Sequence, residues 1–170
     1  MPIVGYVAGV RARDLAVEYP TVTPESSALD AARLLAGHRL PGLLVVDAEN
    51  RPVAVIPGSQ LLRYTIPHHV RDDPALARVY DERHADQLCS RLAGKHVTDL
   101  LAEERMPLPV VDADATAMEI ASVMAAARSP VVAVSGEADR TDAPMIGVIT
   151  ASHLLDRLLP AAPPTPPDTG

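Results

Sequence analysis

Short groups of apolar residues recur along the chain at two different spacings. Continuous runs rich in Val, Leu and Ile are typical of buried strands, whereas apolar residues at helical spacing indicate one face of a helix. The expected strands are an extended segment ending near Val22, residues 43–46 and 53–56, a second extended segment ending near Val111, and residues 131–134 and 146–149.

The helical stripes lie between and after these strands. The expected helices begin at about Ala28, cover about 58–64, begin near Ala117 and cover about 151–159. Ser26 or Ser27 is placed to cap the first of them, and Asp114 to cap its counterpart in the second half. The order of elements is therefore the same in both halves of the chain.

The second half also repeats the sequence of the first. Residues 20–47 align with residues 109–136 without a gap, and residues 53–62 align in the same way with residues 146–155. The identical pairs in the longer alignment are Pro20 and Pro109, Val22 and Val111, Ala28 and Ala117, Ala32 and Ala121, Ala36 and Ala125, Arg39 and Arg128, Pro41 and Pro130, and Val45 and Val134. Charged or proline-rich loops hold the extra residues of the second copy. The pattern indicates a duplicated β-α-β-β-α unit.

One copy alone is too small to cover its own sheet. A unit of roughly fifty residues with two helices leaves one face of a three-stranded sheet exposed. Two copies can press these faces together and share one core. We therefore predict an α+β fold in which two β-α-β-β-α repeats pack sheet to sheet with pseudo-twofold symmetry.

The repeats occupy defined parts of the chain. The first repeat, with its N-terminal segment, is placed at residues 1–66 and the second at 96–159. Residues 67–95 are expected to connect the repeats through a long helix that begins at Pro74, because an intermittent apolar stripe runs from there up to the stop signal at Gly94. The proline-rich residues 160–170 are expected to be a disordered tail.

Composition and charge narrow the range of functions. The chain has 170 residues, a net charge of -7 and 2% aromatic residues. An acidic chain disfavours a nucleic-acid partner, and the scarcity of aromatic rings argues against stacking on single-stranded bases. The single cysteine, Cys89, cannot form an internal disulfide, and no apolar run approaches the ~18 residues of a membrane-spanning helix. Because the opening apolar segment also lacks a basic leader, we expect a cytoplasmic protein without direct membrane insertion.

Two short motifs accompany the repeat. An Arg-x-Pro sequence precedes the middle strand of each copy, at 39–41 and 128–130, and the junctions between last strand and last helix read AVIPGSQ at 54–60 and GVITASH at 147–153. With these motifs in register, residues from about 11 to 159 resemble a tandem cystathionine-β-synthase (CBS) domain pair. In its stand-alone size the chain resembles small bacterial proteins of this type, those of actinobacteria in particular.

The resemblance implies a regulatory module. Proteins of this family bind adenine nucleotides or S-adenosylmethionine in clefts between the repeats and act as sensors for an attached or partner protein. Their junction motif carries a Thr or Ser that can bond a phosphate and, three residues later, an Asp that accepts the ribose hydroxyls. This chain departs from the motif, because Pro57 replaces the hydroxyl residue of the first copy and Gln60 and His153 replace the Asp of each copy.

Two ligand sites follow from the resemblance. The site expected around the second junction comprises Thr150, Ser152, His153, Val111, Arg128 and Pro130. A second site, around the junction that has lost its hydroxyl residue, comprises Ser59, Gln60, Val22, Arg39 and Pro41. The residues alone leave a structural alternative open, in which Thr150 caps the last helix, His153 lies on its exposed side, and the two arginines neutralise helix C-termini.

The sequence contains no recognisable catalytic constellation. It has no Gly-rich phosphate loop before a lysine and no nucleophile elbow, and its histidines do not form a metal-ligand spacing. We therefore expect a protein that is not an enzyme, holds no metal and requires no cofactor. AMP, ADP, ATP or S-adenosylmethionine is the regulatory ligand that the resemblance suggests.

The resemblance also suggests protein partners. Small pairs of this family often assemble as a disc-like homodimer, and a transporter or an enzyme is a possible client. An alternative reading is a ligand-free structural module whose cleft is plugged by its own side chains. That reading places a hydrophobic partner surface on the final helices, at Leu61, Leu62, Leu154, Leu155 and Leu158.

Overall fold

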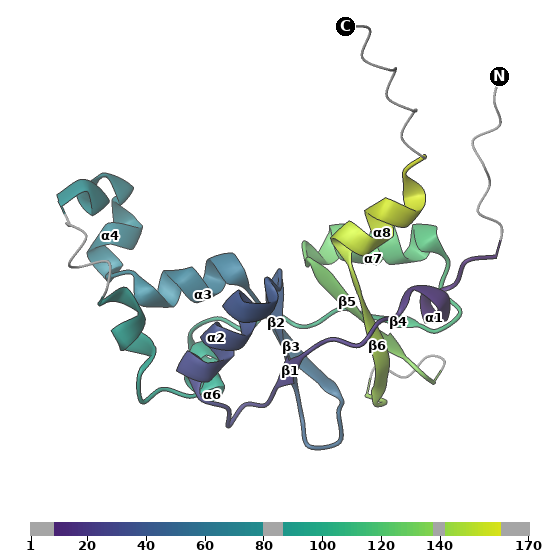
Figure 1. Cartoon of the computed structure of the whole chain (residues 1–170), viewed down its shortest axis with the longest axis horizontal. Coiled ribbons are helices and arrows are strands. Elements are labelled where there is room, and N and C mark those ends of the chain that lie inside the picture. Colours follow the sequence, from purple (N-terminus) through teal and green to yellow (C-terminus); the bar gives the residue numbers. More distant parts are fainter. Residues whose placement is uncertain (1–8, 80–86, 138–141, 161–170) are drawn as a thin grey trace, which may run out of the picture.

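The computed structural model describes residues 9–79, 87–137 and 142–160, so the expected tail lies outside the described residues except for Pro160. The first repeat consists of α1 (Ala12–Leu15), β1 (Thr21–Val22), α2 (Ala28–His38), β2 (Gly42–Val46), β3 (Pro52–Pro57) and α3 (Gly58–Thr65). The second consists of α6 (Val97–Glu103), β4 (Val110–Asp112), α7 (Ala117–Ala127), β5 (Val131–Ser135), β6 (Met145–Thr150) and α8 (Ala151–Leu158), as Figure 1 shows. The predicted β-α-β-β-α unit is confirmed in both, and each is preceded by one short helix.

Each repeat forms a three-stranded mixed sheet. In the first sheet β1 pairs in parallel with β2, and β2 pairs antiparallel with β3; β4, β5 and β6 reproduce this arrangement. The register shifts between Val45 and Val46 and again between Val134 and Ser135, which are equivalent positions in the alignment of the repeats. The two halves therefore share their topology down to a local irregularity.

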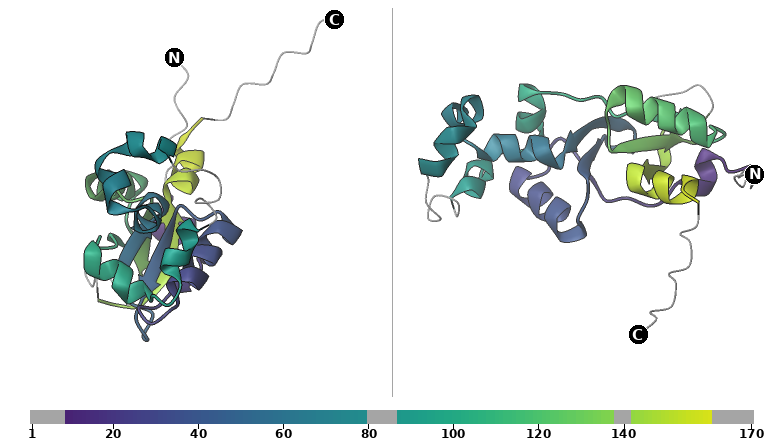
Figure 2. Two further views of the ribbon diagram at one scale, coloured as in Figure 1. Left: turned by 90° about the vertical axis from the view of Figure 1, so that its left-hand side faces the viewer. Right: turned by 90° about the horizontal axis from the view of Figure 1, so that it is seen from above.

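The two sheets face one another across an aliphatic core. Leu44 and Val55 of the first sheet pack in one buried cluster with Val131, Ala133 and Val148 of the second. Helices cover the outer face of each sheet, so the layers run helices, sheet, sheet, helices (Figures 1 and 2). The predicted sheet-to-sheet packing is confirmed, and the apolar face that one repeat leaves uncovered is buried by the other.

The short leading helix of each repeat packs against the opposite repeat. Leu15 of α1 is buried in the core of the second repeat, and Leu100 of α6 is buried in the core of the first. Backbone hydrogen bonds accompany these contacts; for example, the N–H of Val97 donates to the carbonyl of Ser26 at 2.9 Å. This exchange of leading segments means that neither core is complete without residues from the other half.

The segment between the repeats differs from the single long helix expected. Its described residues form α4 (His68–Asp72) and two 3-10 helices, η1 (Pro74–Val79) and η2 (Leu88–Leu92). Asp73 is extended, with φ -137° and ψ 94°, because the ring of the following proline disfavours helical backbone in the residue before it. Pro74 thus begins η1 and ends α4. The part of the expected helix at residues 80–86 lies outside the described residues.

Of the predicted helix caps, the one for α2 is confirmed and the one for α7 is wrong. Ser27 accepts a hydrogen bond from the N–H of Asp30 and caps α2, as predicted. In the second repeat the predicted cap, Asp114, is wrong, because Thr116 accepts the N–H of Glu119 and the Glu119 carboxylate accepts the N–H of Thr116. This reciprocal pair satisfies two N–H groups at the start of α7. Asp114 instead forms an ion pair with Arg13 of the leading segment.

Candidate ligand-binding site

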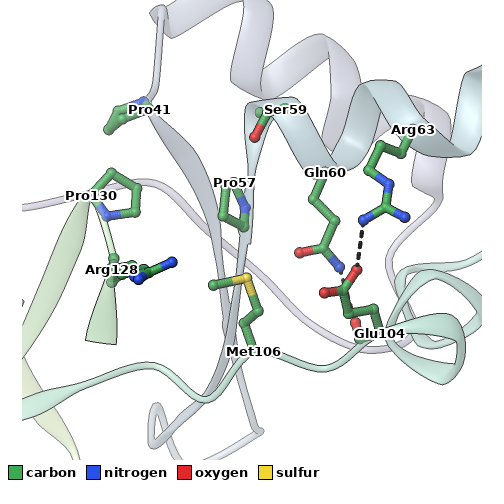
Figure 3. A pocket seen from close by; sticks show the side chains of 11 residues that line it. Pro41, Pro57, Ser59, Gln60, Arg63, Glu104, Met106, Arg128 and Pro130 are labelled. Carbon is green, nitrogen blue, oxygen red and sulfur yellow. Dashed lines mark hydrogen bonds and ion pairs between the residues drawn. The ribbon is translucent and has the colours of Figure 1, made fainter. Parts of the chain in front are cut away.

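A pocket of about 650 Å³ lies between the two repeats (Figure 3). Its walls come from the strand-to-helix junction of the first repeat and from two separate segments of the second. The lining residues are Pro41, Pro57, Gly58, Ser59, Gln60, Arg63, Glu104, Met106, Arg128, Ser129 and Pro130. The volume lies within the range of about 300–1,000 Å³ that is usual for small-molecule sites.

The first wall is the beginning of α3. The helix starts directly after Pro57, which offers no side-chain cap, and the N–H of Gly58 donates to the carbonyl of Pro41 at 3.1 Å. The next N–H groups of the first turn are therefore left without a side-chain acceptor, beside the exposed hydroxyl of Ser59. Such a helix start attracts anions, since its N–H groups point outward and the helix dipole is positive there.

Gln60 is a buried pocket residue whose side chain is held in place by hydrogen bonds. Its side chain is buried, with 5% exposed, and its Nε2 donates to the Tyr64 hydroxyl at 3.2 Å and to the Glu104 carbonyl at 3.0 Å. The Tyr64 hydroxyl in turn donates to the carbonyl of Leu100. Both Nε2 protons are thus in use, whereas Oε1 is buried and has no hydrogen-bond partner among the described residues. A buried acceptor without a donor costs about 1–3 kcal/mol, so this atom favours a ligand that can donate to it.

Two polar side chains of α3, Arg63 and Tyr64, are held by residues of the second repeat. Arg63 forms an ion pair with Glu104, with 3.3 Å between Nη1 and Oε2 (Figure 3). Burial raises the pKa of the Tyr64 hydroxyl, which stays protonated as a donor at neutral pH. These contacts bind the leading segment of the second repeat to the face of α3 that carries the pocket.

The opposite wall is the end of α7. Arg128 is the C-cap residue of that helix and adopts the left-handed conformation, with φ 50° and ψ 36°. Its side chain points from the second repeat toward Pro57 and Met106 (Figure 3). In the part of the chain that the structure describes, its guanidinium group has no hydrogen bond or ion pair. The pocket therefore contains one unneutralised cation.

The pocket combines residues that the sequence had assigned to two different sites. Pro41, Ser59 and Gln60 come from the site predicted around the first junction, and Arg128 and Pro130 from the site predicted around the second. They meet because the pseudo-twofold axis places the C-cap of one repeat opposite the strand-to-helix junction of the other.

The remaining predicted residues lie elsewhere. Thr150 caps α8 by accepting the N–H of His153 at 3.2 Å, and Ser152 is exposed beside it. Val22 and Val111 are buried in the cores beneath the helices. Arg39 is the left-handed C-cap of α2, with φ 52°, and does not line the pocket.

Several lining residues were not predicted from the sequence. Glu104 and Met106 fall in the stretch where the second copy gains residues, so the alignment of the repeats gives them no partner. In the structure, the counterpart of Met106 is Val17. The N–H of Val55 donates to the carbonyl of Met106, and the N–H of Val148, the residue equivalent to Val55, donates to the carbonyl of Val17. Arg63 could have been found, because it lies one helical turn after Ser59 on the same helix.

Smaller pockets occur elsewhere among the described residues. One of about 590 Å³ lies at the edge of β6, beside Glu18 and Tyr19, and one of about 430 Å³ lies along β4. Within residues 9–79, 87–137 and 142–160, no group of three or more His, Cys, Asp or Glu side chains is arranged to hold a metal ion. Across the same residues, no helix has the length and apolarity needed to span a membrane.

Comparison with known proteins agrees with the fold. A sequence model of the CBS domain matches residues 12–66 and 97–160. The crystal structure of a CBS domain-containing protein of unknown function from Kribbella flavida is 44% identical over 88% of this chain and 99% of that chain, with a TM-score of 0.73.

More distant structures share the fold alone. CBSX2 from Arabidopsis thaliana, a CBS-pair protein, is 23% identical over 88% of this chain and 94% of its own, with a TM-score of 0.66. A crystal structure of CBSX2 in complex with AMP is 22% identical over 88% of this chain and 96% of its own, with a TM-score of 0.60. No curated protein matches the chain.

Proposed function

The chain belongs to the CBS domain family, and from this premise we propose that it is a non-catalytic sensor that binds an adenine nucleotide or a related adenosyl ligand between its two repeats. The ligand occupies the pocket that Gln60 and Arg128 line from opposite sides. The observation that carries the proposal is the buried Oε1 of Gln60, an acceptor without a donor in a pocket of mononucleotide size. The complex of CBSX2 with AMP supports an adenylate as the ligand.

The residues suggest how such a ligand is held. The first-turn N–H groups of α3 and the Ser59 hydroxyl donate to a phosphate, and Gln60 Oε1 accepts a hydrogen bond from a ribose hydroxyl or an amino group of the ligand. Pro41, Pro57 and Pro130 offer apolar surface to the base. Because Oε1 is shielded from solvent, the ligand reaches it only when a flexible lining side chain such as Met106 moves.

Ligand binding is transmitted to a partner protein through the contacts between the repeats. Gln60, Arg63 and Tyr64 all bond to the segment from Leu100 to Glu104, which is the leading segment of the second repeat. A ligand that engages Gln60 therefore acts on the contact between the repeats. It shifts their arrangement only by the difference between its affinities for the two arrangements.

The test is isothermal titration calorimetry with AMP, ADP, ATP and S-adenosylmethionine, accompanied by thermal unfolding. Ser59→Ala removes a pocket hydroxyl, and Ser152→Ala removes the hydroxyl at the equivalent position of the second repeat. Binding that weakens in Ser59→Ala and is unchanged in Ser152→Ala supports the proposal. Absence of heat and of a thermal shift for all four ligands at millimolar concentration contradicts it.

A second candidate function is a ligand-independent structural module. Leucines on and directly after the last helices of the repeats are exposed: Leu62 (63%) on α3, and Leu155 (54%), Leu158 (45%) and Leu159 (64%) around α8. Leu62 and Leu155 occupy equivalent positions in the two repeats. Paired exposed leucines on the last helices suit a symmetric homodimer or a partner protein such as a transporter. Sedimentation of Leu62→Glu and Leu158→Glu tests it: an assembly state that does not change in either variant contradicts this function.

A further inference from the structure

Two buried polar side-chain atoms in the described part of the chain have no hydrogen-bond partner. They are Oε1 of Gln60 on α3 and Nε of Arg71 on α4. Native proteins satisfy the large majority of such atoms, so each exception calls for a physical reason. Both residues contact the end of α6. The amide of Gln60 donates to the Glu104 carbonyl at 3.0 Å, and the guanidinium of Arg71 faces the carboxylate of the preceding residue, Glu103.

Arg71 lies between two acceptors and is bonded to one of them. Its Nη2 is 2.7 Å from Nδ1 of His68 on the same helix, and this ring nitrogen must be unprotonated in order to accept. Its Nη1 is 4.0 Å from Oε2 of Glu103, whereas a charge-assisted hydrogen bond is about 2.8 Å long. A guanidinium can bind a carboxylate through two parallel N–H groups, of which Nε can be one. A turn of the Arg71 guanidinium from His68 to Glu103 would therefore give the buried Nε an acceptor.

Glu104 extends this arrangement to the pocket. Its carboxylate pairs with Arg63 at 3.3 Å, and both side chains line the pocket (Figure 3). The end of α6 thus carries two adjacent carboxylates, with Arg63 as the cation on the pocket side and Arg71 as the cation on the α4 side. A ligand phosphate in the pocket competes with Glu104 for Arg63. The field of the two carboxylates then acts on Arg71, whose side chain is only 18% exposed and is therefore weakly screened by salt.

We infer that Arg71 is a switch that couples the pocket to α4: when a ligand phosphate engages Arg63, Arg71 turns from His68 to Glu103 and ties α4 to the second repeat. The inference rests on the proposed function and adds the route by which ligand binding reaches the connecting segment. α4 lies at the outer end of the first repeat (Figure 1), and none of its residues lines the pocket. A partner protein can therefore detect the ligand on a surface outside the pocket.

Hydrogen exchange of α4, measured by mass spectrometry with and without saturating ADP, tests the switch. The N–H groups of Val70 and Arg71 donate to the Pro67 carbonyl, so their exchange reports the opening of this helix. In the wild type, ADP slows the exchange at least about fivefold, which is the lower end of ordinary coupling between two sites. Glu103→Gln removes the charge that attracts Arg71, so ADP still binds but no longer slows the exchange. Glu25→Gln is the matched control, because Glu25 is exposed in the turn before α2, and this variant behaves as the wild type.

A variant measured without ligand tests the same step independently of the proposed function. Arg63→Gln removes the cation on the pocket side, as a competing phosphate would. The Arg63 side chain is 59% exposed, so the variant should keep its fold, which thermal unfolding checks. Without ADP, Arg63→Gln should show the slow exchange of α4 that ADP gives the wild type. The double variant Arg63→Gln/Glu103→Gln should not show it.

The outcomes separate the inference from the proposed function. ADP binding to the wild type without slower exchange in α4, or equal slowing in Glu103→Gln, overturns the inference and leaves the proposed function standing. Unchanged exchange in Arg63→Gln without ligand overturns the inference as well. If ADP does not bind the wild type, the proposed function is contradicted for this ligand, and slow exchange in Arg63→Gln then supports the switch alone.

Discussion

Gln60 combines a structural and a binding role in one amide group. Its Nε2 fastens α3 to the leading segment of the second repeat, and its Oε1 remains as an acceptor in the pocket. From the sequence, Gln60 stood out as a departure from the family's Asp and as a member of one predicted ligand site. The reason for the departure depends on the Glu104 carbonyl, which belongs to an inserted loop that no sequence pattern places next to α3.

Removal of the Tyr64 hydroxyl tests this hydrogen-bond chain. Tyr64→Phe leaves the Leu100 carbonyl and one Gln60 proton without a partner, which lowers the free energy of unfolding by about 1–2 kcal/mol. Because burial raises the pKa of Tyr64, the stability linked to its protonated form is complete below the ordinary tyrosine value of 10.0 and is lost as the pH rises through the folded value.

Urea unfolding of both proteins at neutral pH and at increasing alkaline pH measures the effect. The difference between wild type and variant should shrink as the pH rises. A variant as stable as the wild type at neutral pH contradicts the role given to the hydroxyl.

The capping pair at the start of α7 gives a second prediction for a single residue. The hydrogen bond from the Thr116 N–H lowers the pKa of Glu119, so the stability that this carboxylate adds is present above its ordinary pKa of 4.5 and is lost as the pH falls through the folded value. Glu119→Gln is therefore less stable than wild type at neutral pH, and the two converge in acid. Unfolding curves that differ equally at both pH values contradict this origin.

Among the elements, strands and helices were predictable where the apolar pattern is strong. Both middle strands are buried over their whole length, so their runs of Val and Leu are unambiguous. The connecting segment was not, because its apolar residues fit a helical stripe whereas Pro74–Val79 and Leu88–Leu92 form 3-10 helices. The cap of α7 was assigned wrongly to Asp114 although Thr116 and Glu119 already formed a capping-box pattern in the sequence.

Close approach of the leading segment to β6 makes Gly147 sensitive to substitution. A Cβ atom there would lie 2.9 Å from the Ala16 Cβ and 3.1 Å from the Val17 carbonyl oxygen. Gly147→Ala should therefore cost about 1–3 kcal/mol of stability through overpacking. Gly37→Ala is the control, because Gly37 is an exposed residue of α2 and a Cβ atom there would meet nothing within 4 Å. This substitution should stabilise the protein by about 0.5 kcal/mol. Chemical denaturation that ranks the two variants in the opposite order would refute the packing.

In the whole molecule, each half completes the other's core. The sequence predicted the shared core between the sheets, because one copy is too small to bury its own sheet. It did not predict the exchange of α1 and α6, since the short leading helices carry too few apolar residues to show which repeat they contact. The pseudo-twofold arrangement of the repeats explains why the pocket draws residues from both predicted sites.

This exchange predicts that the chain unfolds as one unit. Leu15 and Leu100 are each 1% exposed in the core of the opposite repeat, so Leu15→Ala and Leu100→Ala should each cost about 2–5 kcal/mol. Each variant should still show a single transition in urea, monitored by circular dichroism and tyrosine fluorescence. Separate transitions for the two halves, or loss of stability confined to one half, would be inconsistent with the exchanged packing.

A crystal structure grown with ADP tests the central claim most directly. We predict nucleotide density between the repeats, with a phosphate beside Ser59 and the Arg128 guanidinium and with a ligand donor within hydrogen-bond distance of Gln60 Oε1. Density only beside Thr150 and His153, or an empty pocket in crystals that contain saturating ADP, would contradict the account.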